Sequence, residues 1–336
     1  MLTITTTALG LALLADTAHA AAFQPKTMRD PLSAREVERG LILGKGWLEF
    51  AVGVDYKKAD GYWDQDGVAA DFTDASFLYT TERVGIRYGI ARRAELFWNV
   101  PAHFVQLTNA TLGTDTAQWG LGDPSFGVRT ELYRSSAPLT SIVAVFSYKA
   151  PAANEAPGNY IGGPSTFDSF VMTTGTPDGS VAIQAKRQFG PAAVTAGGAY
   201  VHRFGGLVQY IIETEQNQFQ GRIKPGDLVI LDADVLLQLG PVAPHGGVVY
   251  TSTDTTAIGT TADGVFHQND NLVDVANSDG WAVDAKLGAI LNLTRGLDLD
   301  FGVGLPLRGE DLLFFPIEDL SPTRGTTYSG TLEFRY

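Results

Sequence analysis

The sequence predicts an all-β protein: a transmembrane, antiparallel, up-and-down β-barrel of about twelve strands, with short periplasmic turns and long extracellular loops. Three observations predict this fold. Apolar and polar residues alternate through many segments, as in strands that face lipid on one side and water on the other. The links between these segments are alternately short and long. No segment stays apolar for the roughly 20 residues that a membrane-spanning helix needs.

The end of the chain shows the alternation most clearly. Tyr328, Phe334 and Tyr336 share one face of an extended segment, and Glu333 and Arg335 share the other. An apolar face for lipid, charges for interior water and a terminal aromatic residue for the headgroup boundary suit a barrel strand. Because half-buried strands of soluble sheets also alternate, the prediction depends on the recurrence of this pattern.

The pattern does recur along the chain. Between Leu297 and Leu307 every second residue is apolar, and Asp298 and Asp300 lie between them. Most such segments exceed the 9–11 residues that a tilted strand needs to cross a bilayer. We expect strands at about 47–57, 76–89, 94–105, 122–133, 139–150, 180–189, 192–204, 227–239, 244–255, 280–294, 297–309 and 326–336.

The links favour a barrel over a sandwich. Outer-membrane barrels have short periplasmic turns, long extracellular loops and an even number of strands, and closure leaves no backbone edge unpaired in lipid. Both chain ends would then lie in the periplasm. Short links fall at 92–93, 135–138, 190–191, 240–244 and 295–296, and long links at about 58–75, 106–121, 151–179, 205–226, 256–279 and 310–325.

The N-terminal residues predict export. Residues 1–20 have the features of a signal peptide, with a short apolar core and a small-x-small cleavage site that ends at Ala20, although no basic residue precedes the core. Residues 21–44 are polar and charged, and form either a periplasmic extension or a plug in the lumen. Residues 45–336 form the barrel. The expected location is the bacterial outer membrane.

Composition excludes several classes of function. A net charge of −13 argues against a nucleic-acid partner, which requires a basic surface. The chain has no cysteine, and its few histidines show neither zinc-ligand spacing nor a serine-hydrolase context. We therefore expect no catalytic residues, no metal site and no cofactor. The pairs Asp232/Asp234 and Asp298/Asp300 could bind a cation or transfer protons, but a charged, water-filled lumen is the favoured interpretation.

The parity of the strands predicts which charged residues line the lumen. The expected lining residues are Glu49, Asp55, Arg87, Glu95, Asp123, Arg129, Lys186, Asp232, Asp234, Asp284, Lys286, Asp298, Asp300, Arg308, Glu333 and Arg335. The parity also turns Glu131, Arg83, Lys149 and Arg203 inward, and with these four counted acids and bases are nearly balanced. The lining would therefore not select strongly by charge, and opposite charges could bridge and narrow the bore.

Two short motifs resemble a known family. The segment Gly120-Leu121-Gly122-Asp123-Pro124 enters a predicted strand, and upstream the segment 87–96 (RYGIARRAEL) leads through a tight turn toward Asn99-Val100-Pro101. Together they resemble the outer-membrane family named for the MetA pathway of phenol degradation. The resemblance implies a β-barrel and the uptake of small compounds, often aromatic or apolar. The last strand resembles the signal that the outer-membrane insertion machinery recognises, through Phe334 and Tyr336.

The sequence therefore favours an outer-membrane channel or uptake transporter that passes a small molecule by passive diffusion, with apolar or aromatic compounds as candidates. The expected partners are outer-membrane lipid, lipopolysaccharide, the insertion machinery and the solute. The alternatives are a structural or adhesive barrel with a closed lumen, a barrel enzyme, and a soluble secreted β-protein.

Overall fold

The computed structural model describes residues 32–64, 66–72, 75–109, 114–136, 138–152, 175–212, 217–259, 272–274, 278–310 and 323–336. The expected signal peptide and residues 21–31 of the expected N-terminal segment lie outside the described residues. Within the described part, no helix is both long and apolar enough to cross a membrane.

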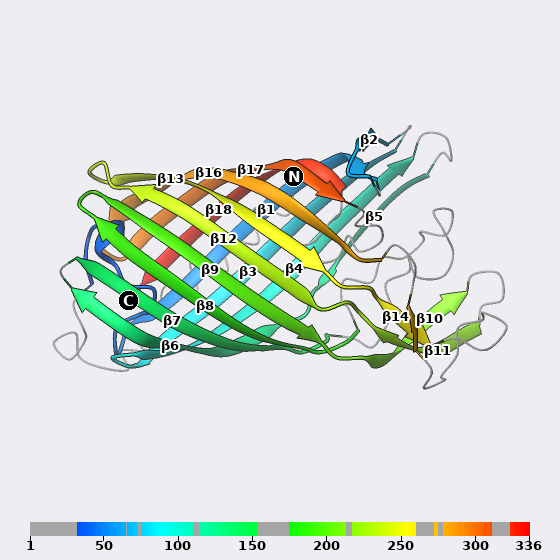
Figure 1. The fold of residues 1–336 in the computed structure, drawn as a ribbon, viewed down its shortest axis with the longest axis horizontal. Helices are drawn as coiled ribbons and strands as arrows, with labels where there is room; N and C mark the ends of the chain where they lie inside the picture. The colour runs from blue at the N-terminus through cyan, green and yellow to red at the C-terminus, as the bar shows by residue number, and fades with distance from the viewer. Residues whose placement is uncertain are drawn as a thin grey trace.

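Twelve antiparallel strands form one closed barrel, which confirms the predicted fold class. Consecutive barrel strands are hydrogen-bonded neighbours, and they tilt strongly against the barrel axis (Figure 1). The strands are β1 (Leu48–Trp63), β3 (Ala75–Ala91), β4 (Ala94–Asn109), β6 (Ser125–Ser136), β7 (Leu139–Lys149), β8 (Asp178–Phe189), β9 (Ala192–Arg203), β12 (Leu228–Leu237), β13 (Val242–Thr253), β16 (Gly280–Thr294), β17 (Leu297–Glu310) and β18 (Thr323–Arg335).

The barrel closes between its first and last strands. β18 pairs with β1 in a register that runs from Glu49 opposite Arg335 to Tyr62 opposite Thr323. The backbone N–H of Tyr336 donates to the carbonyl oxygen of Leu48 at 2.8 Å, so the pairing reaches the end of the chain. Closure satisfies the backbone groups of both edge strands, which an apolar bilayer would otherwise leave unpaired.

The outer face is apolar, as the alternation predicts. Leu231 and Leu287 are 49 % and 59 % exposed although they lie in the middle of strands, because they point away from the lumen. Aromatic side chains gather on the same face at neighbouring strands, the arrangement expected at a membrane interface. Ring centroids lie 6.4 Å apart in Tyr56–Tyr328, 5.6 Å in Phe126–Tyr148 and 6.3 Å in Tyr250–Trp281.

The barrel has two different ends. We call the end with the tight links at 92–93, 190–191, 240–241 and 295–296 the short-turn end, and the opposite end the loop end. Gly190 and Gly240 have φ of 61° and 64° in two of the tight links, a conformation that glycine adopts without strain. The short turns are gathered at one end in Figure 1, and the long links leave from the other.

The loop end contains strands that were predicted as loops, so this part of the prediction was wrong. A second, four-stranded sheet lies within the links 205–226 and 256–279, and further strands extend β1 and β4 (Figure 1). Short strands without inside–outside alternation leave no period-two signal, although the segment LVQYII is rich in β-formers. These strands are β2 (Ala69–Asp71), β5 (Thr114–Leu121), β10 (Gly206–Ile212), β11 (Asn217–Lys224), β14 (Ala257–Gly259) and β15 (Leu272–Asp274).

Adjacent residues of β12 test the register. Leu231→Arg places a cation against lipid, and near the bilayer midplane this should lower the free energy of unfolding by about 2–4 kcal/mol. Asp232→Arg places the same group on the lumen side and should cost far less. Urea unfolding of vesicle-inserted protein, read by heat-modifiable gel mobility, measures both variants. Equal losses at the two positions would contradict the register.

Candidate functional site

Residues 32–44 lie against the lumen face of the barrel at the short-turn end. The segment contains the 3-10 helix η2 (Glu36–Glu38). Val37 is fully buried among Ala193, Leu236 and Ala243, which come from three different strands. The backbone N–H of Glu36 donates to Oε1 of Gln238 at 2.7 Å. The contacts therefore bind the segment to β9, β12 and β13.

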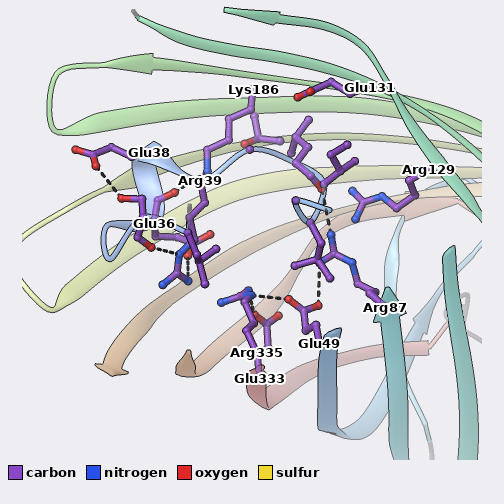
Figure 2. Close-up of a pocket in the computed structure, with 18 of the residues that line it drawn as sticks. Glu36, Glu38, Arg39, Glu49, Arg87, Arg129, Glu131, Lys186, Glu333 and Arg335 are labelled. Atoms are coloured by element: carbon purple, nitrogen blue, oxygen red, sulfur yellow. Dashed lines mark hydrogen bonds and ion pairs between the residues drawn. The ribbon is translucent and has the colours of Figure 1, made fainter. Parts of the chain in front are cut away.

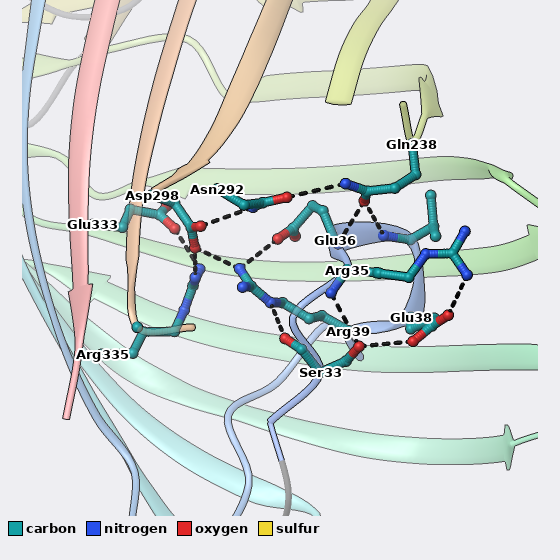
Figure 3. A network of polar contacts seen from close by, with 12 residues as sticks. Ser33, Arg35, Glu36, Glu38, Arg39, Gln238, Asn292, Asp298, Glu333 and Arg335 are labelled. Atoms are coloured by element: carbon teal, nitrogen blue, oxygen red, sulfur yellow. Dashed lines mark hydrogen bonds and ion pairs between the residues drawn. The ribbon is translucent and has the colours of Figure 1, made fainter. Parts of the chain in front are cut away.

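Ion pairs attach the same segment to further strands (Figure 3). Nη1 of Arg39 contacts Oδ2 of Asp298 on β17 at 2.5 Å and Oε2 of Glu36 at 2.6 Å. From β8, Nζ of Lys186 donates to the carbonyl oxygen of Glu36 at 2.9 Å. The side chains of Arg39 and Asp298 are only 5 % and 2 % exposed. The segment is thus held by charged groups from opposite sides of the barrel.

A partial ring of ion pairs, called the ring below, follows the barrel wall at this level, and Figure 2 shows its members Glu49, Arg87 and Arg129. Arg87 on β3 donates to Glu49 on β1 and to Glu95 on β4, each at 2.8 Å. Arg129 on β6 donates to Glu95 at 3.1 Å and to Oε1 of Gln184 on β8 at 2.8 Å. Side-chain hydrogen bonds therefore link β1, β3, β4, β6 and β8, and the contact between Arg129 and Gln184 passes over β7.

Arg335 joins this ring to the acids of β17 and β18. Its Nε donates to Oε2 of Glu49 at 2.6 Å, and its Nη1 and Nη2 contact Asp298 and Glu333. Asp298 also binds Arg39, so the wall network and the N-terminal segment share one carboxylate. This shared carboxylate places the segment at the seam region where β17, β18 and β1 meet.

Buried carboxylates in this network are paired more than once. Glu95 is fully buried and accepts from Arg87, from Arg129 and from the backbone N–H of Leu43 in the segment. A buried charge is tolerated only when it is paired and hydrogen-bonded, and these contacts supply both. The geometry accordingly favours a fixed arrangement of the wall charges around the segment.

A cavity of about 720 Å³ remains between the segment and the wall. Charged side chains of both signs line it, and Figure 2 shows Lys186 on one side and Glu333 with Arg335 on the other. The cavity also reaches Arg92 and Arg93 in the β3–β4 turn. Its chemistry suits the binding of a small polar group by several weak contacts.

His245 bridges two of the expected lining acids. Its Nδ1 lies 3.5 Å from Oδ2 of Asp234, and its Nε2 lies 3.0 Å from Oδ1 of Asp300. Between β13 and β17 the imidazole of His245 passes over β16 at Gly288. A Cβ atom at Gly288 would lie 2.6 Å from Nε2 of His245, so only glycine leaves room for the imidazole. The sequence gives no sign of this bridge, because the arrangement depends on cross-strand register.

Other expected lining residues lie nearer the loop end. Asp123 is buried 3.7 Å from Nζ of Lys149, which also pairs with Asp178 at 2.5 Å. Asp55 pairs with Arg83 across β1 and β3. Cross-strand pairing places Asp232, Asp284 and Lys286 on the lumen side of β12 and β16, away from the ring around Glu95.

Arg308 does not join the lumen residues. The β16–β17 register shifts between Val283 and Asp284, so Arg308 pairs with Val283, and its guanidinium lies 5.8 Å from the centroid of the Trp281 ring. Trp281 stacks on Tyr250 among the outward-facing aromatic residues. The expectation for Arg308 was therefore wrong, because a single extra residue reverses the parity beyond it.

Glu36 and Arg39 were not among the expected site residues. Alternation in the sequence assigns faces only to strands, and residues 32–44 do not form a strand. The described residues contain no group of three or more His, Asp or Glu side chains placed to hold a metal ion. The charged residues of the lumen wall can therefore hold residues 32–44 and contact a small molecule in the cavity beside them.

Comparison with known proteins supports the fold alone. No family model and no curated protein matches the sequence. The structure is similar to the COG4313 outer membrane channel from Pseudomonas putida F1, with a TM-score of 0.64, 13% sequence identity, and coverage of 91% of this chain and 99% of that one. The chain therefore has the β-barrel fold of bacterial outer-membrane proteins.

Two further structures are less similar. The translocator domain of autotransporter NalP from Neisseria meningitidis gives a TM-score of 0.45 at 9% identity, covering 99% of this chain and 98% of that one. The P. putida toluene transporter TodX gives 0.35 at 7% identity, covering 86% and 89%. Similarity this low carries no argument about this chain.

Glu95 should be essential for the stability of the ring. Glu95→Gln leaves Arg87 and Arg129 short of a buried counter-charge, and breaking such a pair should cost about 3–5 kcal/mol of unfolding free energy. Glu333→Gln is the matched control, because Glu333 is 30 % exposed and Arg335 keeps Asp298 and Glu49. Urea titration in vesicles compares the two. A Glu333 effect as large as that of Glu95 would refute this ranking.

Arg39 should anchor the N-terminal segment. Arg39→Ala removes the contact with Asp298, so the backbone amides of Glu36 and Val37 should exchange with solvent faster, as measured by hydrogen–deuterium exchange. Arg35→Ala is the control, since Arg35 pairs only with exposed Glu38 among the described contacts. Unchanged exchange in the Arg39 variant would mean that the packing of Val37 and the hydrogen bonds with Gln238 and Lys186 hold the segment without Arg39.

Proposed function

We propose that the protein is an outer-membrane channel or uptake transporter that passes a small molecule through its barrel by passive diffusion. The observation that carries this proposal is the closed barrel with a charged cavity beside residues 32–44 at its short-turn end. A water-filled path in a barrel needs a polar lining, and a lumen with many weak contacts allows a solute to enter and leave.

The orientation follows from the loop lengths. Short turns face the periplasm and long loops face the outside in bacterial outer-membrane barrels. Residues 32–44 would then lie at the periplasmic exit, where contacts with five or more strands let them act as a plug that narrows the bore. The last strand, which pairs with β1 up to Tyr336, would serve as the signal for the insertion machinery. Outer-membrane lipid and lipopolysaccharide would surround the apolar face.

The solute is proposed from the resemblance in the sequence. The motifs at 87–101 and 120–124 resemble a family of putative transporters of small aromatic or apolar compounds. In the structure these two segments lie together, because the backbone N–H of Gly122 donates to the carbonyl oxygen of Pro101 at 3.0 Å. We assign no catalytic role to any residue of the barrel.

A structural barrel with a closed lumen is the second candidate. It is favoured by the same multiple attachment of residues 32–44, which would close the bore if the segment never moves. The two candidates differ in one measurable property, the passage of solute through the folded protein.

Single-channel conductance in a planar bilayer tests the proposal. The intact mature protein should pass a small current, and deletion of residues 21–44 should raise it, because the cavity then opens to the full lumen. Deletion of residues 21–31 alone is the matched control and should leave the current unchanged. If correctly folded protein stays silent in all three forms, the structural barrel replaces the channel.

A further inference from the structure

The charges on the lumen wall are separated by sign across the barrel. In the described part of the chain, cross-strand pairing assigns charged side chains to the lumen on two contiguous groups of strands. We call the strands β3, β4, β6, β7, β8 and β9 the basic wall, and the strands β12, β13, β16, β17 and β18 the acidic wall. The strand β1 joins the two walls on one side, and β9 is hydrogen-bonded to β12 on the other.

The imbalance of each wall is clear from its residues. On the basic wall, described bases outnumber acids by three when Asp123, which precedes β6 and lies beside Lys149, is counted with it; the bases are Arg83, Arg87, Arg129, Arg134, Lys149, Lys186 and Arg203, and the acids are Glu95, Asp123, Glu131 and Asp178. On the acidic wall, described acids outnumber bases by four, with His245 counted as neutral; the acids are Asp232, Asp234, Asp284, Asp298, Asp300 and Glu333, and the bases are Lys286 and Arg335.

This separation creates a field across the lumen rather than along it. Low-dielectric walls focus the field of fixed charges into the space between them. A net anion or cation gains little, because each wall repels the ion that the other attracts. A molecule with a positive and a negative end gains at both walls when it lies across the bore.

Residues 32–44 contact the two walls with groups of opposite charge or polarity. The cationic group of the segment, Arg39, binds Asp298 on the acidic wall. Two carbonyl oxygens of the segment accept from the basic wall, Glu36 O from Lys186 at 2.9 Å and Leu41 O from Arg87 at 3.2 Å. The segment is therefore an occupant whose positive end meets the acids and whose electronegative ends meet the bases.

One nitrogen of the Arg39 guanidinium is left without a hydrogen-bond acceptor. Its Nη2 is buried and has no hydrogen-bond partner, while Nη1 and Nε are used. The neighbouring cavity is lined by groups from both walls, including Lys186 on one and Asp234, Asp300 and Glu333 on the other. The cavity therefore offers a small molecule cationic groups from one wall and carboxylates from the other.

We propose that the lumen binds and favours dipolar solutes, small molecules that carry an ammonium-type group and a carboxylate-type group at separate ends, and that such solutes compete with residues 32–44 for the two walls. The positive end faces the acidic wall and the negative end the basic wall. The passage of such solutes rests on the proposed channel function, whereas their binding does not. An aromatic or apolar body between the two ends is compatible with this arrangement.

Liposome swelling with two isomers tests the preference. β-Alanine is a zwitterion, and lactamide has the same atoms but no formal charges. With the intact mature protein, β-alanine should enter faster than lactamide. Asp232→Asn combined with Asp284→Asn weakens the acidic wall without removing a described contact of residues 32–44. It should lower the ratio of β-alanine entry to lactamide entry about threefold, the effect of one weak ion pair.

Glu82→Gln is the matched control. It removes a carboxylate from β3 that points outward, opposite Val54 and Ala102, so it should leave the ratio unchanged. Swelling with lactamide but no preference for β-alanine would overturn this proposal and leave the channel function standing. No swelling with either isomer would overturn the passage of such solutes, and together with a silent barrel in the conductance measurement it would overturn the channel function.

If neither isomer causes swelling, a binding measurement tests whether dipolar solutes bind in the lumen. Hydrogen–deuterium exchange at the amides of Glu36 and Val37 should accelerate with β-alanine and not with lactamide, since only the zwitterion competes for Lys186 and Asp298. The acceleration should be smaller in the Asp232→Asn, Asp284→Asn variant, which weakens the wall that receives the cationic end. Equal exchange with both isomers would overturn the proposal whether or not the barrel conducts.

Discussion

Pairing of every backbone N–H and C=O along a closed circle of strands is the constraint on which the rest of this structure depends. Because β18 pairs with β1, the barrel has no edge, and each strand can turn one whole face to an apolar surrounding. Polar side chains are then confined to the interior. The lumen therefore collects charge at a density that a soluble core would not tolerate.

The interior charges are ordered rather than scattered. Buried acids such as Glu95 and Asp298 each serve two or more basic partners, and one of these partners, Arg39, comes from outside the strands. Mutual pairing explains how so many ionisable groups coexist in a narrow space. Because most charges have a partner nearby, the net charge can differ in sign between the two walls although the lumen lining as a whole is nearly neutral.

The fold was predictable because its signal is local, whereas the site depends on distant contacts. The alternation in segments such as 297–307 reports the two faces of a strand directly. Arg39 and Asp298 are 259 positions apart, and no local pattern joins them. The outward turn of Arg308 depends on one bulge, and the bridge made by His245 depends on the absence of a side chain at Gly288. Such features follow from register, which the sequence alone leaves open.

The position of residues 32–44 has a consequence for biogenesis. The segment precedes β1 in the chain, yet it touches β8, β12 and β17, which are synthesised much later. Its contacts can form only when the sheet curls around it, and the contact of Arg335 with the same Asp298 forms only when the last strand arrives. The interior therefore reaches its final packing only once the last strand is in place, although the residues that fill it precede every barrel strand in the chain.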